Sequence, residues 1–131
     1  MSTLGRSNAI ALARRTLKWC ERTMGTNGRK RYRLRAYVRR GPDDDDICGE
    51  YDCWDNEIYI YWDKCDTVRE LISTCIHEWT HSIQPILTKY YKYPGTYSRN
   101  PYERQARYNE KKWTPICWKE IRTGYMKKQN L

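Results

Sequence analysis

The two histidines of this chain lie four residues apart, in His77-Glu78-Trp79-Thr80-His81, and no other histidine occurs among its 131 residues. A helix makes one turn in about 3.6 residues, so side chains four apart lie on one face. Two imidazoles on one face can bind one metal ion, and the glutamate between them can reach a water molecule on that ion. The pattern predicts a metal site that activates water, with Glu78 as the catalytic base.

A catalytic zinc ion usually takes three protein ligands and leaves one position for water. Because no histidine remains, the third ligand must come from another residue type, and the candidates are Glu103, Glu110, Glu120 or an acidic residue upstream of the motif. We expect one zinc ion per chain. The acidic run at residues 43–46 is typical of a solvated loop, so a second metal site is not expected there.

The six cysteines form no C-x-x-C pair, and the chain begins without a pattern typical of a secretory signal. We therefore expect mainly free, buried thiols, with disulfides or a second zinc site as the less favoured alternatives. The positions concerned are Cys20, Cys48, Cys53, Cys65, Cys75 and Cys117.

The elements that must position the motif can be read from the periodicity of apolar residues. Before the motif, the sequence predicts a helix over 7–23 and a strand over 30–39. Residues 56–62 predict a second strand, which we expect to pair with 50–54 as a hairpin.

The motif itself falls in a predicted helix over about 67–84, which starts with a capping box at Thr67 and ends near Pro85. A second helix is predicted over about 100–112, with Pro101 in its first turn. A closing helix is predicted over about 115–124. Together these elements predict one α+β domain over residues 1–131, with a small twisted, mostly antiparallel sheet.

Charge is unevenly spread along the chain, whose net charge is +9. Residues 1–41, a basic segment with the first helix and strand, carry 12 Lys and Arg and one acidic residue. Residues 42–70 carry two Lys and Arg and 11 acidic residues. The two segments could face each other in the fold. Alternatively, residues 1–41 could contact nucleic acid or an acidic protein surface.

The motif and its surroundings resemble the gluzincin metallopeptidases, in which H-E-x-x-H lies on one helix and a glutamate on the next helix is the third ligand. In this chain Glu103 follows His81 after 21 intervening residues, in Asn100-Pro-Tyr-Glu-Arg-Gln-Ala. That stretch is similar to the P-[YF]-E-x-x-A ligand helix of compact bacterial and viral members. The resemblance covers about residues 56–112, which would form the metallopeptidase core of a zincin-like fold.

The resemblance implies that His77, His81 and Glu103 bind zinc, and that Glu78 takes a proton from the zinc-bound water and later gives it to the leaving amine. It also implies that a polypeptide substrate lies beside an edge strand. The residues of that strand would be Glu57, Ile58, Tyr59, Ile60, Tyr61 and Trp62.

The chain departs from the larger members, such as thermolysin, where an aspartate four residues after the ligand glutamate orients the first histidine. Arg107 stands at that place. Arg107 could instead pair with Glu103 across one helical turn, and the outer partner of His77 would be Asn100 or a backbone carbonyl. Tyr97 and Tyr108 are the candidates to stabilise an oxyanion.

The sequence thus predicts a small zinc-dependent metallopeptidase. The alternative is a non-catalytic or weakly catalytic zincin-fold component of a larger assembly, such as a virion or a nucleoprotein particle, docked through residues 1–41. Basic proteases of the SprT-like kind use a third histidine, which this chain does not have. With no apolar run long enough to span a membrane, we expect an intracellular protein or one within such an assembly.

Overall fold

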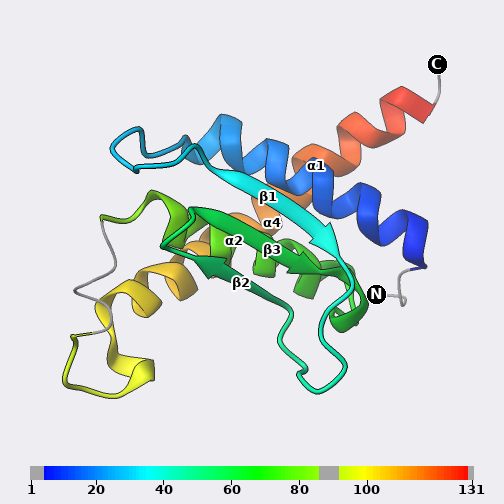
Figure 1. Ribbon diagram of the computed structural model, residues 1–131. Coiled ribbons are helices and arrows are strands. Elements are labelled where there is room, and N and C mark those ends of the chain that lie inside the picture. Colours follow the sequence, from blue (N-terminus) through cyan, green and yellow to red (C-terminus); the bar gives the residue numbers. More distant parts are fainter. Residues whose placement is uncertain (1–4, 86–91, 130–131) are drawn as a thin grey trace.

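The computed structural model of the chain describes residues 5–85 and 92–129 (Figure 1). Within these ranges it is an α+β fold with three α-helices and one three-stranded sheet, which confirms the predicted class. The helices are α1 (Arg6–Met24), α2 (Val68–Ile83) and α4 (Pro101–Gln129). The strands are β1 (Arg35–Arg39), β2 (Gly49–Asp52) and β3 (Glu57–Tyr61), and two short 3-10 helices are η1 (Trp62–Lys64) and η2 (Tyr97–Arg99).

The sheet is mixed, with the strand order β1-β3-β2. The predicted hairpin is confirmed, because β2 pairs antiparallel with β3 and places Tyr51 opposite Ile58. β1 runs parallel to β3 and is only five residues long, so the prediction of a mostly antiparallel sheet with a strand over 30–39 is wrong in these respects. After β1, the connection over residues 40–48 leaves a space for one strand beside β1 and leads into β2. β3 then fills this space, between β1 and β2.

The predicted role of residues 57–62 as an edge strand is also wrong. β3 is the central strand, with β1 on one side and β2 on the other, and Trp62 already belongs to η1. A strand paired on both sides has no free backbone groups to offer a peptide. Among the described strands, β1 and β2 are the edges.

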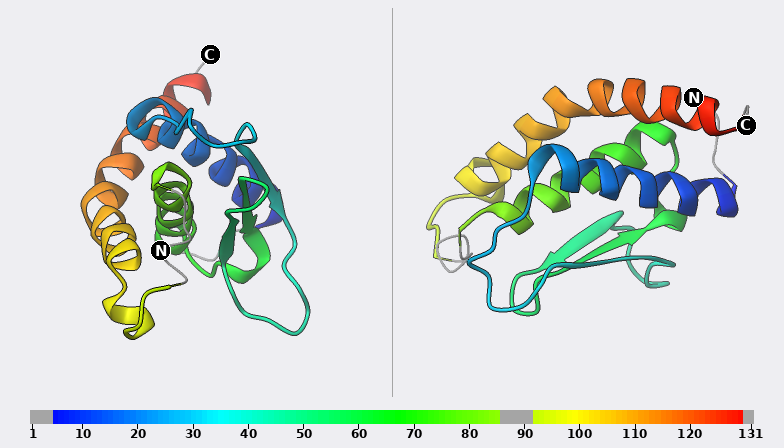
Figure 2. Two further views of the ribbon diagram at one scale, coloured as in Figure 1. Left: turned by 60° about the vertical axis from the view of Figure 1, so that its left-hand side comes forward. Right: turned by 90° about the horizontal axis from the view of Figure 1, so that it is seen from above.

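The helices form two layers on one face of the sheet (Figure 2). α1 and α2 lie against the strands, and α4 lies on their other side, beside α2 and then beside α1. Ile58 and Ile60 of β3 are fully buried against this helical layer. The indole N–H of Trp19 in α1 donates to a carboxylate oxygen of Glu120 in α4 at 2.5 Å, so residues 101 positions apart join the first and last helices.

α2 forms as its sequence predicts. The hydroxyl oxygen of Thr67 accepts a hydrogen bond from the backbone N–H of Glu70 at 3.1 Å and so caps the helix. The apolar face that contains Leu71, Ile72, Cys75 and Ile76 is inaccessible to solvent. Burial of this face orients the opposite side of the helix, which carries His77 and His81, toward α4.

α4 is one continuous helix, so the predicted break at Thr114-Pro115 and the predicted end near Gly124 are wrong. A proline inside a helix removes one hydrogen bond and can kink the chain. Here Trp113, Cys117 and Ile121 continue the inward face on both sides of Pro115, and their packing against the core outweighs that loss. None of the described helices combines the length and apolarity that crossing a membrane would require.

Candidate metal centre

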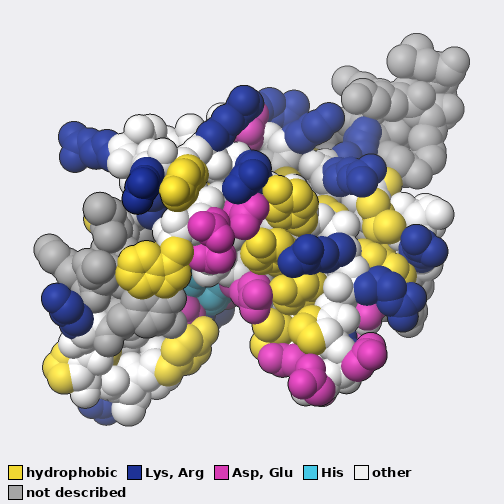
Figure 3. All heavy atoms as spheres, in the orientation of Figure 1, with side chains coloured by type: hydrophobic (Ala, Val, Ile, Leu, Met, Phe, Trp, Pro, Cys, Tyr) yellow, Lys and Arg dark blue, Asp and Glu magenta, His cyan; other side chains and the backbone are white. Residues whose placement is uncertain are grey.

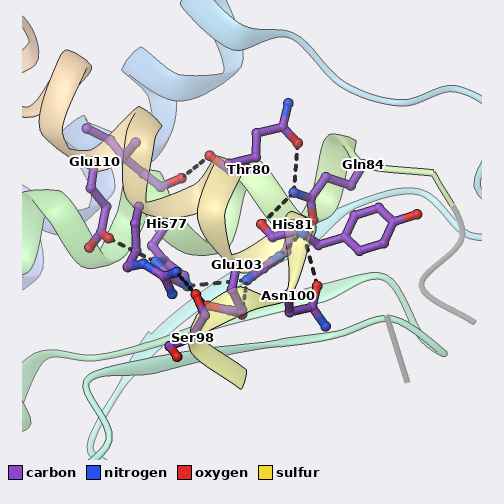
Figure 4. A network of polar contacts seen from close by, with 12 residues as sticks. His77, Thr80, His81, Gln84, Ser98, Asn100, Glu103 and Glu110 are labelled. Carbon is purple, nitrogen blue, oxygen red and sulfur yellow. Dashed lines mark hydrogen bonds and ion pairs between the residues drawn. The ribbon is translucent and has the colours of Figure 1, made fainter. Parts of the chain in front are cut away.

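Three side chains from two helices converge at one point between α2 and α4 (Figure 4). The Nε2 atoms of His77 and His81 lie 3.2 Å apart. One carboxylate oxygen of Glu103 lies 3.1 Å from His77 Nε2 and the other lies 2.8 Å from His81 Nε2. The three residues therefore form a group that could hold a metal ion.

These distances agree with the size of a zinc site. Zinc binds imidazole nitrogen and carboxylate oxygen at about 2.0–2.2 Å in a tetrahedron, whose edges are then about 3.3–3.5 Å long. All three separations are shorter than such an edge, by about 0.1 Å between the two histidines and by up to about 0.5 Å between His81 and Glu103. The donor set of two imidazoles and one carboxylate is also one that catalytic zinc commonly takes.

Gln84 fixes the tautomer of His81. Its amide nitrogen donates to the backbone carbonyl of Tyr102 at 2.9 Å and to the side-chain oxygen of Gln105 at 2.8 Å. Its own side-chain oxygen, 2.8 Å from His81 Nδ1, must therefore be the acceptor, and Nδ1 carries the proton. The lone pair of a neutral His81 then lies on Nε2, toward Glu103.

Glu110 plays the same part for His77. Nδ1 of His77 lies 3.0 Å from a carboxylate oxygen of Glu110, which can only accept when ionised. Histidines that bind metals usually donate the other ring N–H to such a partner, which orients the ring and strengthens the ligand. Glu110 is thus an outer partner, and Glu103 is the acidic side chain that faces both Nε2 atoms.

The charges at the site favour a cation between these groups. Burial alone would lower the pKa of His77, but its contacts with Glu103 and Glu110 raise that pKa to about 10. Burial would likewise raise the pKa of Glu103, yet its contacts with the two histidines hold that pKa well below its usual range. A positive charge is therefore stabilised where the ligand atoms meet.

Glu78 lies beside the group and is itself buried. Burial raises the pKa of its carboxyl to about 6, an effect that the neighbouring histidines partly offset. Within residues 5–85 and 92–129, no hydrogen bond or ion pair engages this carboxylate. A carboxyl whose pKa is close to neutral pH is suited to accept and return a proton.

The remaining candidates from the sequence differ in their outcome. Tyr97 in η2 belongs to the site, where burial and its hydrogen bond to Glu103 raise the pKa of its phenol. Tyr108 is as exposed as Tyr97, at 64%, but it lies on another face of α4, in the hollow toward Arg69, so it is not brought to the ligands. Asn100 caps α4 by accepting from the backbone N–H of Tyr102, and the outer partner of His77 is Glu110 instead.

Arg107 does not take up Glu103 in the way that its spacing suggested. Its guanidinium donates to the backbone carbonyl of Ser98. This contact holds the end of η2, and with it Tyr97, against the first turns of α4. The arginine thus supports the segment beside the ligands, while Glu103 faces the histidines.

The site opens to solvent between the sheet and the segment that precedes α4. Histidine atoms are visible at the surface there, with acidic side chains beside them (Figure 3). The side chain of His77 is 14% exposed, whereas that of Glu103 is only 4% exposed. Water can therefore reach the edge of His77, while Glu103 lies deeper.

A second acidic group, Asp52, Asp55 and Glu57, lies near the turn of the hairpin. Asp52 accepts from the backbone N–H groups of Trp54 and Asp55, as expected for a turn. Glu57 pairs with Arg35 at 3.2 Å. These contacts explain the cluster as part of the hairpin.

Two residues of the site were not assigned their role from the sequence. Glu110 follows Glu103 by seven residues, which places it on the ligand face of α4, and Gln84 directly follows the last residue of α2, three residues after His81. That periodicity was the signal that could have identified them as outer partners. No family model matches the chain, and neither a curated protein nor a solved structure is significantly similar to it.

Proposed function

We propose that the chain is a zinc-dependent metallopeptidase, as its resemblance to the gluzincins implied. The observation that carries the proposal is the convergence of His77 Nε2, His81 Nε2 and the Glu103 carboxylate, with both Nδ1 atoms held by separate partners. Holding each Nδ1 atom by its own partner leaves both Nε2 atoms to face the Glu103 carboxylate, which is the arrangement that two histidine ligands of one ion require.

When bound, zinc lowers the pKa of a water molecule to about 7 and polarises a carbonyl group. Glu78 accepts the proton of the attacking water and returns it to the leaving amine, a task suited to its raised pKa. The phenol of Tyr97, beside Glu103, can donate to the oxygen on which negative charge develops. The metal site lies beside only one small sheet, so we expect broad specificity for peptide substrates.

Glu78→Gln tests this proposal. The variant should bind one zinc ion per chain, as measured by elemental analysis, and should cleave fluorescent casein about 10²–10⁴-fold more slowly. Glu21→Gln, an exposed change on α1, is the matched control and should leave cleavage unaffected.

Cleavage by Glu78→Gln at the wild-type rate would refute the role of Glu78. Undiminished zinc binding by His77→Ala would refute the metal site. Stoichiometric zinc without cleavage of any peptide would favour the alternative of a non-catalytic component of an assembly.

A further inference from the structure

Beside Glu110, residues of α2 and α4 line an open, shallow hollow of about 530 Å³ that contains none of the candidate metal ligands. Four cationic side chains line it, and the one acidic residue is Glu110, which is held by His77. The cations are Arg69, Arg104, Arg107 and Lys111. We refer to them and their hollow as the basic groove.

The cations of the basic groove are not neutralised within the fold. Across residues 5–85 and 92–129, no ion pair joins any of the four to a carboxylate, and Arg69, Arg104 and Lys111 are exposed. Like charges that share a hollow repel one another. An anion that binds there would relieve the repulsion without breaking an existing pair.

The cationic side of α4 continues beyond the basic groove. A second hollow of about 220 Å³ follows along the same helix, lined by Arg15, Arg122, Trp118 and several apolar side chains. Arg104 and Arg122 are 18 residues apart in α4, which corresponds to about 27 Å at about 1.5 Å per residue. Figure 2 shows this helix as an uninterrupted ridge beside α2 and α1.

We propose that the basic groove binds the phosphate backbone of a nucleic acid. A nucleic acid strand presents a regular row of phosphates, so a helix face with cationic side chains spread over about 27 Å can contact several of them. Exposed basic side chains such as Arg69, Arg104 and Lys111 bind such a repeating anion irrespective of its sequence. The exposed ring of Tyr108, which lines the groove, adds a surface on which a base can stack.

This location differs from the one that the basic composition of residues 1–41 suggested. It is lined by Glu110, the outer partner of His77, and by none of the three candidate ligand residues. A nucleic acid bound there would hold the protein in place while the metal site remained open to another molecule.

The test is fluorescence anisotropy with labelled 16-nucleotide DNA, single-stranded and duplex, at several salt concentrations. The triple variant Arg69→Gln, Arg104→Gln, Lys111→Gln should bind roughly tenfold or more weakly at low salt, and its log–log salt slope should fall by about 3. Glutamine is a good helix former and the three positions are exposed, so the helices should remain intact.

The matched control removes three exposed cations elsewhere, in Arg29→Gln, Arg31→Gln, Arg33→Gln, and should lose at most about threefold. An equal loss in the control, or none in the triple variant, would overturn the proposal. So would poly-glutamate that competes as well as DNA of the same charge, because the groove would then bind acidic chains in general. Stronger binding of single strands than of duplex would assign the groove to unpaired nucleic acid, and the reverse result to duplex.

Discussion

Replacement of Gln84 by alanine tests how much the orientation of His81 contributes to zinc binding, because it leaves His81 itself in place. Gln84 does not face the metal position, but its oxygen accepts from His81 Nδ1 at 2.8 Å. Without it, the His81 ring can rotate and its tautomer is no longer fixed. Loss of such an outer partner typically weakens metal affinity about 10–100-fold.

That change in affinity corresponds to about 1.4–2.7 kcal/mol. Zinc stabilises the folded chain in proportion to the logarithm of its free concentration relative to Kd, so the stabilisation at a fixed zinc level falls by the same amount. For a domain of this size, about 1 kcal/mol shifts Tm by roughly 3–5 °C. The zinc-induced rise in Tm should therefore be smaller by roughly 4–14 °C in Gln84→Ala.

The assay is thermal unfolding with and without buffered zinc, so that any loss of stability in the metal-free variant cancels. Gln105→Ala is the matched control, because it removes one contact to the Gln84 amide and leaves the contact to Tyr102 and the acceptor of His81 in place. Its zinc-induced shift should stay within a few degrees of wild type. A full zinc-induced shift in Gln84→Ala would refute the argument that this glutamine orients His81.

Three further predictions concern the fold and its titratable groups. Gly49→Ala should lower the free energy of unfolding, measured with urea, by about 1–3 kcal/mol. The new Cβ would lie 2.8 Å from Thr74 Cγ2 and 2.9 Å from the Tyr59 carbonyl oxygen. Gly28→Ala is the control, because a Cβ there meets nothing within 4 Å. Glu78→Gln should stabilise the metal-free protein by about 2 kcal/mol above pH 6, because the buried carboxyl of Glu78 is harder to ionise in the folded than in the unfolded protein. This gain in the free energy of unfolding should vanish as the pH falls toward 4.5, where the carboxyl is protonated in both states. An equal gain at both pH values would contradict the argument. The core thiols, whose pKa values burial raises, should react with a thiol reagent at pH 8 only after unfolding, which a time course in denaturant would show; they are Cys20, Cys75 and Cys117.

The local part of this site could be predicted because it lies within one helix. Residues four apart share a face in any α-helix, so His77 and His81 had to lie together once the capping residue and the apolar face of α2 were recognised. Glu103 needed more, since its place depends on how α4 packs against α2. The resemblance to the gluzincins supplied that information, whereas the residue pattern alone left Glu103, Glu110 and Glu120 as candidates.

The sheet could be predicted only in part. Alternation of side chains identifies a strand and its buried face, but it does not say which strands are neighbours. The order β1-β3-β2 depends on the long excursion over residues 40–48, so the central position of β3 was missed. The helix break expected at Pro115 failed for a similar reason, because long-range packing outweighed a local preference.

The unbroken course of α4 has a mechanical consequence. The helix carries Glu103 in its first turn and reaches, at Glu120, the residue that receives the indole N–H of Trp19. The contact at Glu120 restricts how α4 can tilt, and this also restricts the first turn that carries Glu103. This distant contact therefore adds to the hydrogen bonds with Gln84 and Thr80 that hold the first turns of α4 beside α2, and a fragment cut before Glu120 would keep those nearby bonds and lose the distant one.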